Sequence, residues 1–185
     1  MNWDQFFMTM VYLTAMKSKD ESTKIGAVIV DIENTILSLG FNGLPRRVND
    51  RIEEPDWPDV HYMKEVPELK QRHQAPEKYY WYEHAERNAI YNTARYGGVD
   101  LRGSIMYTQG LPCSDCARGI IQSGISTVVI HKKWMDSSMF INNDKWSESA
   151  KRTDRMFTES GVTVKIYDGP IITEIVGLSN RERIL

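Results

Sequence analysis

Two short segments carry a histidine and two cysteines that could share one metal ion, and this pairing restricts how the chain can fold. The first segment is His84-Ala85-Glu86, and the second is Pro112-Cys113-Ser114-Asp115-Cys116. The chain has only two cysteines, and the second segment contains both. One imidazole nitrogen and two thiolates suit Zn²⁺, and three protein ligands leave the fourth tetrahedral position open for water. The fold must therefore bring the two segments together.

The spacing within each segment predicts its local structure. Cys113 and Cys116 are three residues apart, so they share one face if they lie on a helix. Pro112 favours a helix start, where the free N–H groups and the positive dipole end favour thiolate over thiol. On an ideal helix His84 and Glu86 would diverge by about 200°. They can converge on one metal if a helix begins near His84.

A three-ligand zinc site with a neighbouring carboxylate predicts catalysis. Bound zinc lowers the pKa of its water enough to supply hydroxide near neutral pH. Glu86 could take the proton of that water, pass it to a ring nitrogen of a substrate and later protonate a departing amine. The alternative is a purely structural zinc site, which usually has four protein ligands. We therefore expect one catalytic Zn²⁺ and ammonia as a product.

Chain length and net charge restrict the number of domains and the class of substrate. A chain of 185 residues with ordinary apolar and charged fractions is expected to form a single domain, residues 1–185. Its net charge of −2 gives no general attraction to nucleic acid, so a small-molecule substrate fits better. The absence of a long apolar run and of a secretory pattern predicts a cytoplasmic protein without membrane association. A reducing compartment would also keep both cysteines available as thiolates.

Hydrophobic periodicity predicts an α/β fold. The expected fold is a three-layer α/β/α sandwich with a central five-stranded mixed sheet, in which the strands at 105–108 and 126–131 are parallel because a helix connects them. Glycines mark helix ends at Gly97-Gly98 and near Gly124. The expected helices are an N-terminal one capped by Asn2, one from His84, one at the cysteines and one at 147–160, and the other strands lie at 25–32, 35–41 and 162–166.

Two segments do not fit this regular alternation. A long insertion at about 49–83 contains four prolines and ends in Tyr79-Tyr80-Trp81-Tyr82. We expect this aromatic stretch to pack near the zinc, and the insertion to form a lid or a subunit contact. A C-terminal extension at about 168–185 contains several isoleucines and is interpreted as an interface strand.

With these elements in order, the chain resembles the zinc-dependent cytidine deaminase superfamily and, within it, the deoxycytidylate (dCMP) deaminase family. H-x-E followed by P-C-x-x-C, with the Glu not a ligand, is the known signature of base deaminases. The segments that carry the resemblance are Gly40–Pro45, Glu83–Ile90 and Leu111–Ala117. The resemblance implies a cytidine deaminase-like fold and hydrolytic deamination of dCMP to dUMP and ammonia, which feeds thymidylate synthesis.

The resemblance also implies substrate contacts. Asn42 would hydrogen-bond the deoxyribose hydroxyl, although Asn before Gly is favoured in turns regardless of function. The backbone around Ala85 and Leu111 would hold the pyrimidine edge, while Glu86 protonates N3.

Phosphate recognition leaves more alternatives open. Arg46 and Arg47 could pair with the phosphate or could simply be solvated. Lys132 and Lys133 are further candidates for the phosphate. Trp134 lies where family members carry an aromatic near the substrate, and it could equally be a packing residue.

Regulation and assembly are further implications of the resemblance. The family is typically oligomeric and often hexameric, so we expect a homo-oligomer. The turn Gly40-Phe41-Asn42-Gly43 would belong to an allosteric site for dCTP and dTTP, with Mg²⁺ accompanying the nucleotide effector.

Two other classes of function stay open. The chain could deaminate another nucleobase, nucleoside or nucleotide, such as cytidine, dCTP, a modified dCMP or adenosine in tRNA. It could also be a non-catalytic binding module that zinc stabilises. The presence of Glu86 argues against a non-catalytic module.

Overall fold

A computed structural model describes residues 1–49, 70–95, 97–137 and 144–173. Its centre is one five-stranded sheet with the strand order β2-β1-β3-β4-β5. Strand β1 runs antiparallel to β2 and β3, whereas β3, β4 and β5 are parallel. The mixed sheet is confirmed, and its strands are β1 (Gly26–Val30), β2 (Ile36–Phe41), β3 (Ile105–Thr108), β4 (Thr127–His131) and β5 (Thr163–Tyr167).

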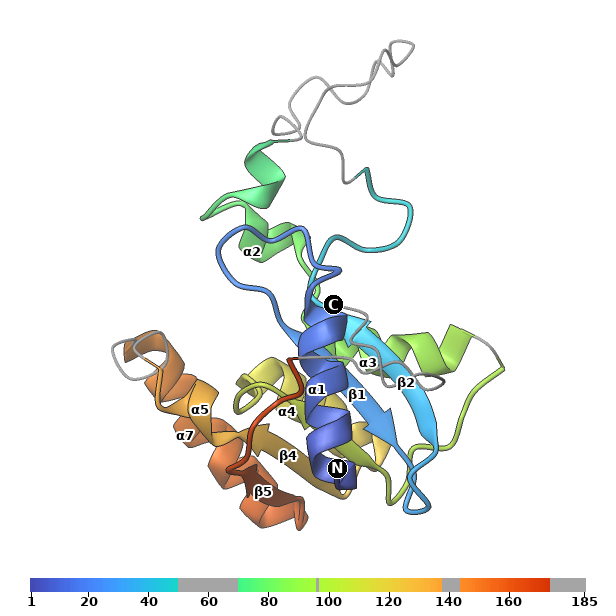
Figure 1. Cartoon of the computed structure of the whole chain (residues 1–185). Helices are drawn as coiled ribbons and strands as arrows, with labels where there is room; N and C mark the ends of the chain where they lie inside the picture. The colour runs from blue at the N-terminus through green and yellow to red at the C-terminus, as the bar shows by residue number, and fades with distance from the viewer. Residues whose placement is uncertain (50–69, 96, 138–143, 174–185) are drawn as a thin grey trace.

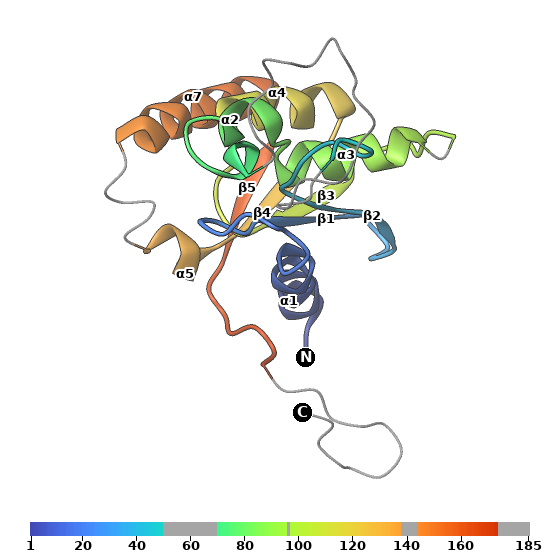
Figure 2. The ribbon, with the colours of Figure 1, turned by 90° about the horizontal axis from the view of Figure 1, so that it is seen from above.

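Helices cover both faces of the sheet (Figures 1 and 2). Helix α1 (Trp3–Ala15) lies on one face, and α3 (Ala85–Arg95), α4 (Ser114–Ser123) and α7 (Asp144–Ser160) lie on the other. Strand β1 is buried on both faces: Val28 and Val30 belong to the core beneath α1, and Ala27 and Ile29 to the opposite core. The three-layer sandwich is therefore confirmed.

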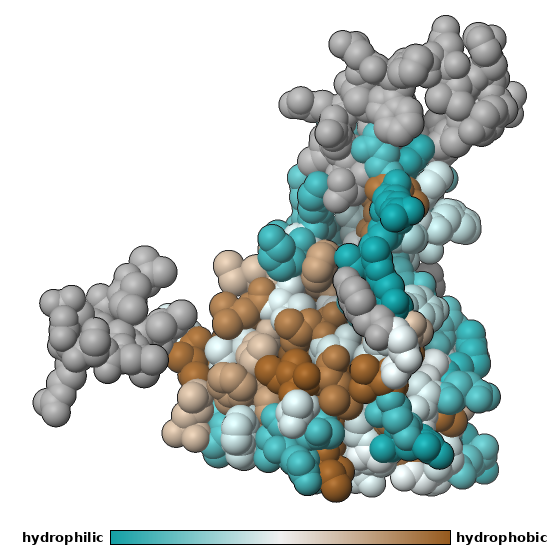
Figure 3. All heavy atoms as spheres, turned by 90° about the vertical axis from the view of Figure 1, so that its right-hand side faces the viewer, coloured by the Kyte–Doolittle hydropathy of each residue, from teal (hydrophilic) through white to brown (hydrophobic). Residues whose placement is uncertain are grey.

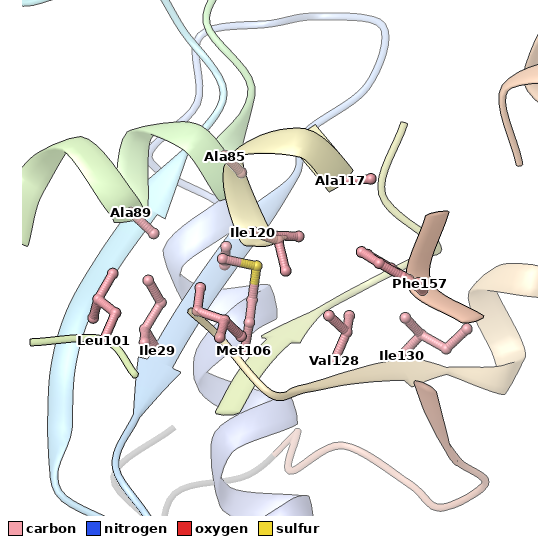
Figure 4. Packing of buried hydrophobic residues seen from close by; sticks show 12 residues of the cluster. Ile29, Ala85, Ala89, Leu101, Met106, Ala117, Ile120, Val128, Ile130 and Phe157 are labelled. Carbon is pink, nitrogen blue, oxygen red and sulfur yellow. The ribbon is translucent and has the colours of Figure 1, made fainter. Parts of the chain in front are cut away.

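The larger core lies between the sheet and the three helices on its second face. In Figure 4, Met106 and Val128 of the sheet point toward Ile120 of α4, and Phe157 of α7 packs above β4. Asn2 caps α1 by accepting a hydrogen bond from the Gln5 N–H (2.8 Å), as its sequence position predicted. Gly124 ends α4 in the left-handed conformation (φ +81°), and Gly97 and Gly98, which follow α3, also have positive φ (+95° and +77°), as expected of helix ends.

Helix α3 approaches β2 so closely that only glycine fits between them. A β carbon on Gly40 would lie 2.2 Å from the Ala85 carbonyl oxygen and 2.3 Å from the Ala89 nitrogen. Asn88 and Asn92 of the same helix donate hydrogen bonds to carbonyl groups of β2, each at 2.8 Å. The start of α3, which follows His84, is thus set by direct contact with the sheet.

The described part of the insertion contains structure that the sequence did not predict. A short 3-10 helix (Gln71–His73) and helix α2 (Lys78–Trp81) precede His84. Outside the insertion, the short helix α5 (Lys132–Met135) after β4 was also not predicted. Tyr79 and Tyr80 are 64% and 83% exposed, so the expectation that they pack down is wrong for these two side chains. The rest of the insertion, 50–69, lies outside the described residues.

The first part of the C-terminal extension runs along α1. The Ile172 N–H donates to the Thr9 hydroxyl (2.9 Å), and Ile171 packs against the core beneath α1. Residues 168–173 form no strand, and residues 174–185 lie outside the described ranges. The interpretation of the extension as an interface strand stays a prediction.

One lateral face of the molecule is notably apolar. Figure 3 shows hydrophobic residues gathered on the side where β2 and α3 lie. The edge strand β2 presents the exposed side chains of Ile36, Leu39 and Phe41. Within the described ranges, no helix has the length and apolar character that a membrane crossing needs.

Candidate active site

The structure brings His84, Cys113 and Cys116 together, as their spacing predicted. The His84 Nδ1 atom lies 3.4 Å from the sulfur of Cys113 and 3.5 Å from that of Cys116. One ligand atom from each residue lies within 4.8 Å of the others, which is a separation that a single metal ion can bridge. His84 directly precedes α3, Cys113 is the N-cap of α4, and Cys116 lies in the first turn of that helix.

The chemistry of this donor set fits a divalent cation. A hydrogen bond with Cys116 lowers the pKa of Cys113 to about 4 against the effect of burial, and the bond with His84 acts in the same direction. The bond with Cys113, together with burial, raises the pKa of Cys116 well above its usual range. Two thiolates this close repel each other, so both can form only with positive charge between them. These residues would hold Zn²⁺.

Glu86 lies beside the ligands and is almost completely buried, with 6% of its surface exposed. Its Oε2 atom is 3.5 Å from the sulfur of Cys116. Burial raises the pKa of the Glu86 carboxyl above its ordinary value. A buried carboxyl of this kind is suited to exchanging protons at a metal-bound water.

A hydrogen-bonded segment holds His84 in position. The Glu83 carboxylate accepts hydrogen bonds from the His84 N–H (3.0 Å) and from Arg87. The Glu83 backbone also exchanges two hydrogen bonds with Gly43, at 3.0 and 2.8 Å. The turn after β2 and the residue before the metal ligand are therefore joined.

Helix α7 supports the cysteine segment, a contact that the sequence did not reveal. Thr153 donates to the Pro112 carbonyl (2.9 Å), and the Ser114 N–H donates to the Ser149 hydroxyl (2.9 Å). Thr153 is fully buried although its helix is otherwise polar on the outside. A threonine inside an amphipathic helix was the available signal, but spacing alone does not name its partner.

Three hydrogen bonds within the chain hold the side chain of Asn42, and its expected contact with the sugar stays a prediction. Its Oδ1 accepts from the Ile25 N–H (2.8 Å), and its Nδ2 donates to the Thr23 carbonyl (2.9 Å) and to the Asp20 carboxylate (3.3 Å). Both amide protons are thus used within the protein. One lone pair of Oδ1 is left for a substrate hydroxyl.

Ala85 and Leu111 lie beside the metal ligands. Ala85 is buried at the start of α3, and the Leu111 N–H faces the sulfur of Met135 at 3.4 Å. Trp134 lies against Gly110, where a β carbon would come within 2.6 Å of its ring. Helix α5 therefore covers the loop that leads to the cysteines, which favours the packing interpretation of Trp134.

The basic residues after β2 lie on the surface. Arg46 donates to the Asn92 side chain of α3 at 2.8 Å, and Arg47 is exposed with φ +69°. Lys132 pairs with Asp168 at 2.8 Å. Arg46 and Lys132 are thus each engaged with a neighbouring side chain, and a phosphate contact by any of these basic residues stays a prediction.

The remaining histidines lie in different settings. His131 is buried, with Nδ1 2.7 Å from the Tyr12 hydroxyl and Nε2 3.0 Å from the Gly169 carbonyl. His73 lies 2.7 Å from the Tyr82 hydroxyl. His61 lies outside the described residues.

Comparison with known proteins reveals clear relatives. Residues 1–132 match the family described as the cytidine and deoxycytidylate deaminase zinc-binding region. A human protein named deoxycytidylate deaminase is 33% identical over 169 residues, which cover 90% of this chain and 80% of the human protein. A Drosophila melanogaster protein named probable deoxycytidylate deaminase is 37% identical over 142 residues, or 76% of this chain. Those residues make up 64% of the fly protein, so the chain spans less than two thirds of that relative's length.

A solved structure supports the same fold. The dCMP deaminase of the cyanophage S-TIM5, crystallised in complex with dCMP and dUMP, has a TM-score of 0.58 and 22% sequence identity. The similarity covers 88% of this chain and 95% of the phage chain. The three-layer arrangement around the mixed sheet is therefore the cytidine deaminase-like fold.

Proposed function

The chain belongs to the deoxycytidylate deaminase family, within the cytidine and deoxycytidylate deaminase zinc-binding superfamily, and from this membership we propose that it hydrolyses dCMP to dUMP and ammonia. The observation that carries the proposal is the convergence of His84, Cys113 and Cys116 beside the buried Glu86. The dUMP formed would feed thymidylate synthesis.

The residues have separate roles in this reaction. His84, Cys113 and Cys116 would hold Zn²⁺, which supplies an acidified water for attack on C4 of the pyrimidine. Glu86 would take the proton of the attacking water and deliver it to N3 of the ring. The same carboxyl then carries a proton to the departing amine. Its burial keeps bulk water from competing for that proton.

Substrate recognition is proposed to use mainly backbone groups near the metal. The Leu111 N–H can donate to the pyrimidine edge if it leaves the Met135 sulfur, which is a weak acceptor. Ala85 would contribute its backbone at the opposite side. Asn42 can still accept one hydrogen bond from the sugar through Oδ1. Phosphate contacts by Arg46 or Arg47 and a substrate contact by Trp134 stay predictions.

The deciding experiment is a deamination assay followed by ultraviolet absorbance on zinc-loaded protein. The substrates are dCMP, cytidine, deoxycytidine, dCTP and 5-hydroxymethyl-dCMP. We expect turnover of dCMP to exceed that of the others. Activity on another member alone would keep the zinc chemistry and replace the substrate, whereas no activity on any of them would favour a zinc-stabilised binding module.

Assembly and regulation are part of the same proposal. The apolar face at β2 supports self-association, since large exposed apolar patches commonly mark protein contacts. Sedimentation that finds a monomer at working concentration would contradict it. Regulation by dCTP and dTTP with Mg²⁺ through Gly40–Gly43 stays a prediction, and an unchanged dCMP saturation curve with added dCTP would refute it.

A further inference from the structure

A buried ion pair joins the insertion to the loop between α1 and β1. The ammonium group of Lys78 lies 3.1 and 3.0 Å from the two carboxylate oxygens of Asp20, and it also donates to the Ser22 hydroxyl. Asp20 is 4% exposed and Lys78 is 9% exposed. Figure 1 shows this loop beside α2. Charged side chains this deeply buried are rare unless they are paired.

The Asp20 carboxylate organises its surroundings as well as binding Lys78. It accepts hydrogen bonds from the Ser22 N–H (2.9 Å) and the Thr23 N–H (3.2 Å), and from the Asn42 side chain (3.3 Å). Asn42 follows directly after β2. Three separate parts of the chain therefore meet at one carboxylate: the loop after α1, the turn after β2 and helix α2.

Lys78 is the residue that docks α2. The structure describes all four residues of α2, and among them Lys78 is the only one with a buried side chain. Tyr79 and Tyr80 point into solvent. Short helices are usually held to a protein by an apolar face, whereas this one is held by a charged residue. Trp81 is half-buried, but its contacts are with Arg72 and Glu77 of the insertion itself, so the ion pair is what ties α2 to the loop after α1.

The docked segment ends at a metal ligand. Tyr82 N–H bonds to the Lys78 carbonyl (2.9 Å), Glu83 is paired with Gly43, and His84 follows. The stretch 78–84 is thus anchored at one end by Lys78 on Asp20 and at the other by Glu83 on Gly43. Gly43 is itself next to Asn42, which bonds to Asp20. Both anchors lead back to the same carboxylate.

We propose that Lys78 is a positioning residue of the metal site, whose ion pair with Asp20 docks residues 78–84 and thereby sets the place of His84 relative to the two cysteines. A buried ion pair seldom adds net stability over apolar substitutes, but an arrangement that separates its two partners leaves a buried charge uncompensated and is strongly disfavoured. That property is useful where a ligand that directly follows an insertion must meet two ligands at the start of a separate helix.

The test compares metal binding in Lys78→Met with the wild type and with Lys151→Met. Lys151 pairs with Glu148 on the exposed surface of α7, so the control removes the same kind of group. We expect Lys78→Met to release zinc to excess chelator about tenfold or more faster. We also expect it to shift the absorption bands of the Co²⁺-substituted protein. Lys78→Arg, which keeps the charge, should recover most of the wild-type behaviour.

The inference rests on the proposed ligand set, and the readouts separate the two. Wild-type protein that binds no metal through His84 would refute the ligand set. Folded Lys78→Met with wild-type zinc release and cobalt bands would overturn the inference alone. If Lys78→Met does not fold, Asp20→Asn combined with Lys78→Met removes both charges. That double variant should release zinc as fast as predicted for Lys78→Met, and wild-type retention would overturn the inference.

Discussion

Replacing Gly40 with alanine should displace the start of α3 and with it the active site. The added β carbon would lie 2.2 Å from the Ala85 carbonyl oxygen and 2.3 Å from the Ala89 nitrogen. Both are backbone atoms, so no side-chain rotation can relieve the overlap. Carbon atoms approach oxygen or nitrogen comfortably at about 3.4 Å, and the helix must therefore retreat by about 1 Å. His84 and Glu86 lie on the turn that has to move.

The expected magnitude has two parts. Overpacking of this kind lowers the free energy of unfolding by about 1–3 kcal/mol. A displacement of about 1 Å at catalytic groups lowers turnover by about 100-fold. The two effects are separable because Gly26→Ala produces a matched overlap elsewhere. Its β carbon would lie 2.2 Å from the Val11 carbonyl oxygen of α1, a helix that carries none of the proposed site residues.

The assay measures urea unfolding, zinc content and kcat for both variants. We expect both to lose stability, and only Gly40→Ala to lose activity per folded, zinc-loaded molecule. Equal activity in the two variants would refute the idea that the contact between β2 and α3 sets the site. Unchanged stability in both would refute the close approach itself.

Three further outcomes are expected. Glu86→Gln should lower kcat by about 10²–10⁴-fold while metal analysis still finds zinc, and normal turnover would refute the assigned proton transfers. Removing zinc should lower the free energy of unfolding by about 2.7 kcal/mol, compared with protein in free zinc at 100 times Kd. A melting temperature that is the same with and without zinc would contradict a metal that joins α3 to α4. Burial raises the pKa of Asp20, but hydrogen bonds from Lys78, Ser22 and Thr23 outweigh it and hold that pKa below 3.8. The ion pair therefore contributes stability above pH 3.8, and this stability is lost as the pH falls through the lower pKa of the folded protein. In Asp20→Asn the free energy of unfolding should therefore fall less steeply with decreasing pH in this acid range. A slope of unfolding free energy against pH that equals that of the wild type would refute the coupling.

Local spacing was enough to predict the metal ligands. Cys113 and Cys116 share a helix start because they are three residues apart. His84 and Glu86 require a helix that begins near His84, and α3 begins at Ala85. The succession along the chain of the five strands and of α1, α3, α4 and α7 also followed from periodicity and from glycine at helix ends, whereas α2 and α5 did not. These features depend on residues near each other in the chain, whose geometry a helix or strand already determines.

Contacts between distant segments could not be predicted in this way. Asp20 and Lys78 are 58 residues apart, and Thr153 reaches Pro112 across 41 residues. The spacing of residues in the sequence does not show whether such a polar side chain is buried against a partner or solvated on the surface. Asn42 illustrates the same limit, since its position suggested a substrate contact while packing gave it three partners within the chain.

The sequence by itself determined which residues can bind zinc and exchange protons, because chemical type and short-range spacing are properties of the chain. The tertiary structure decided how those residues are held. The close approach at Gly40, the ion pair beneath α2 and the support of α7 depend on how elements pack against each other, and that packing is settled by the whole core.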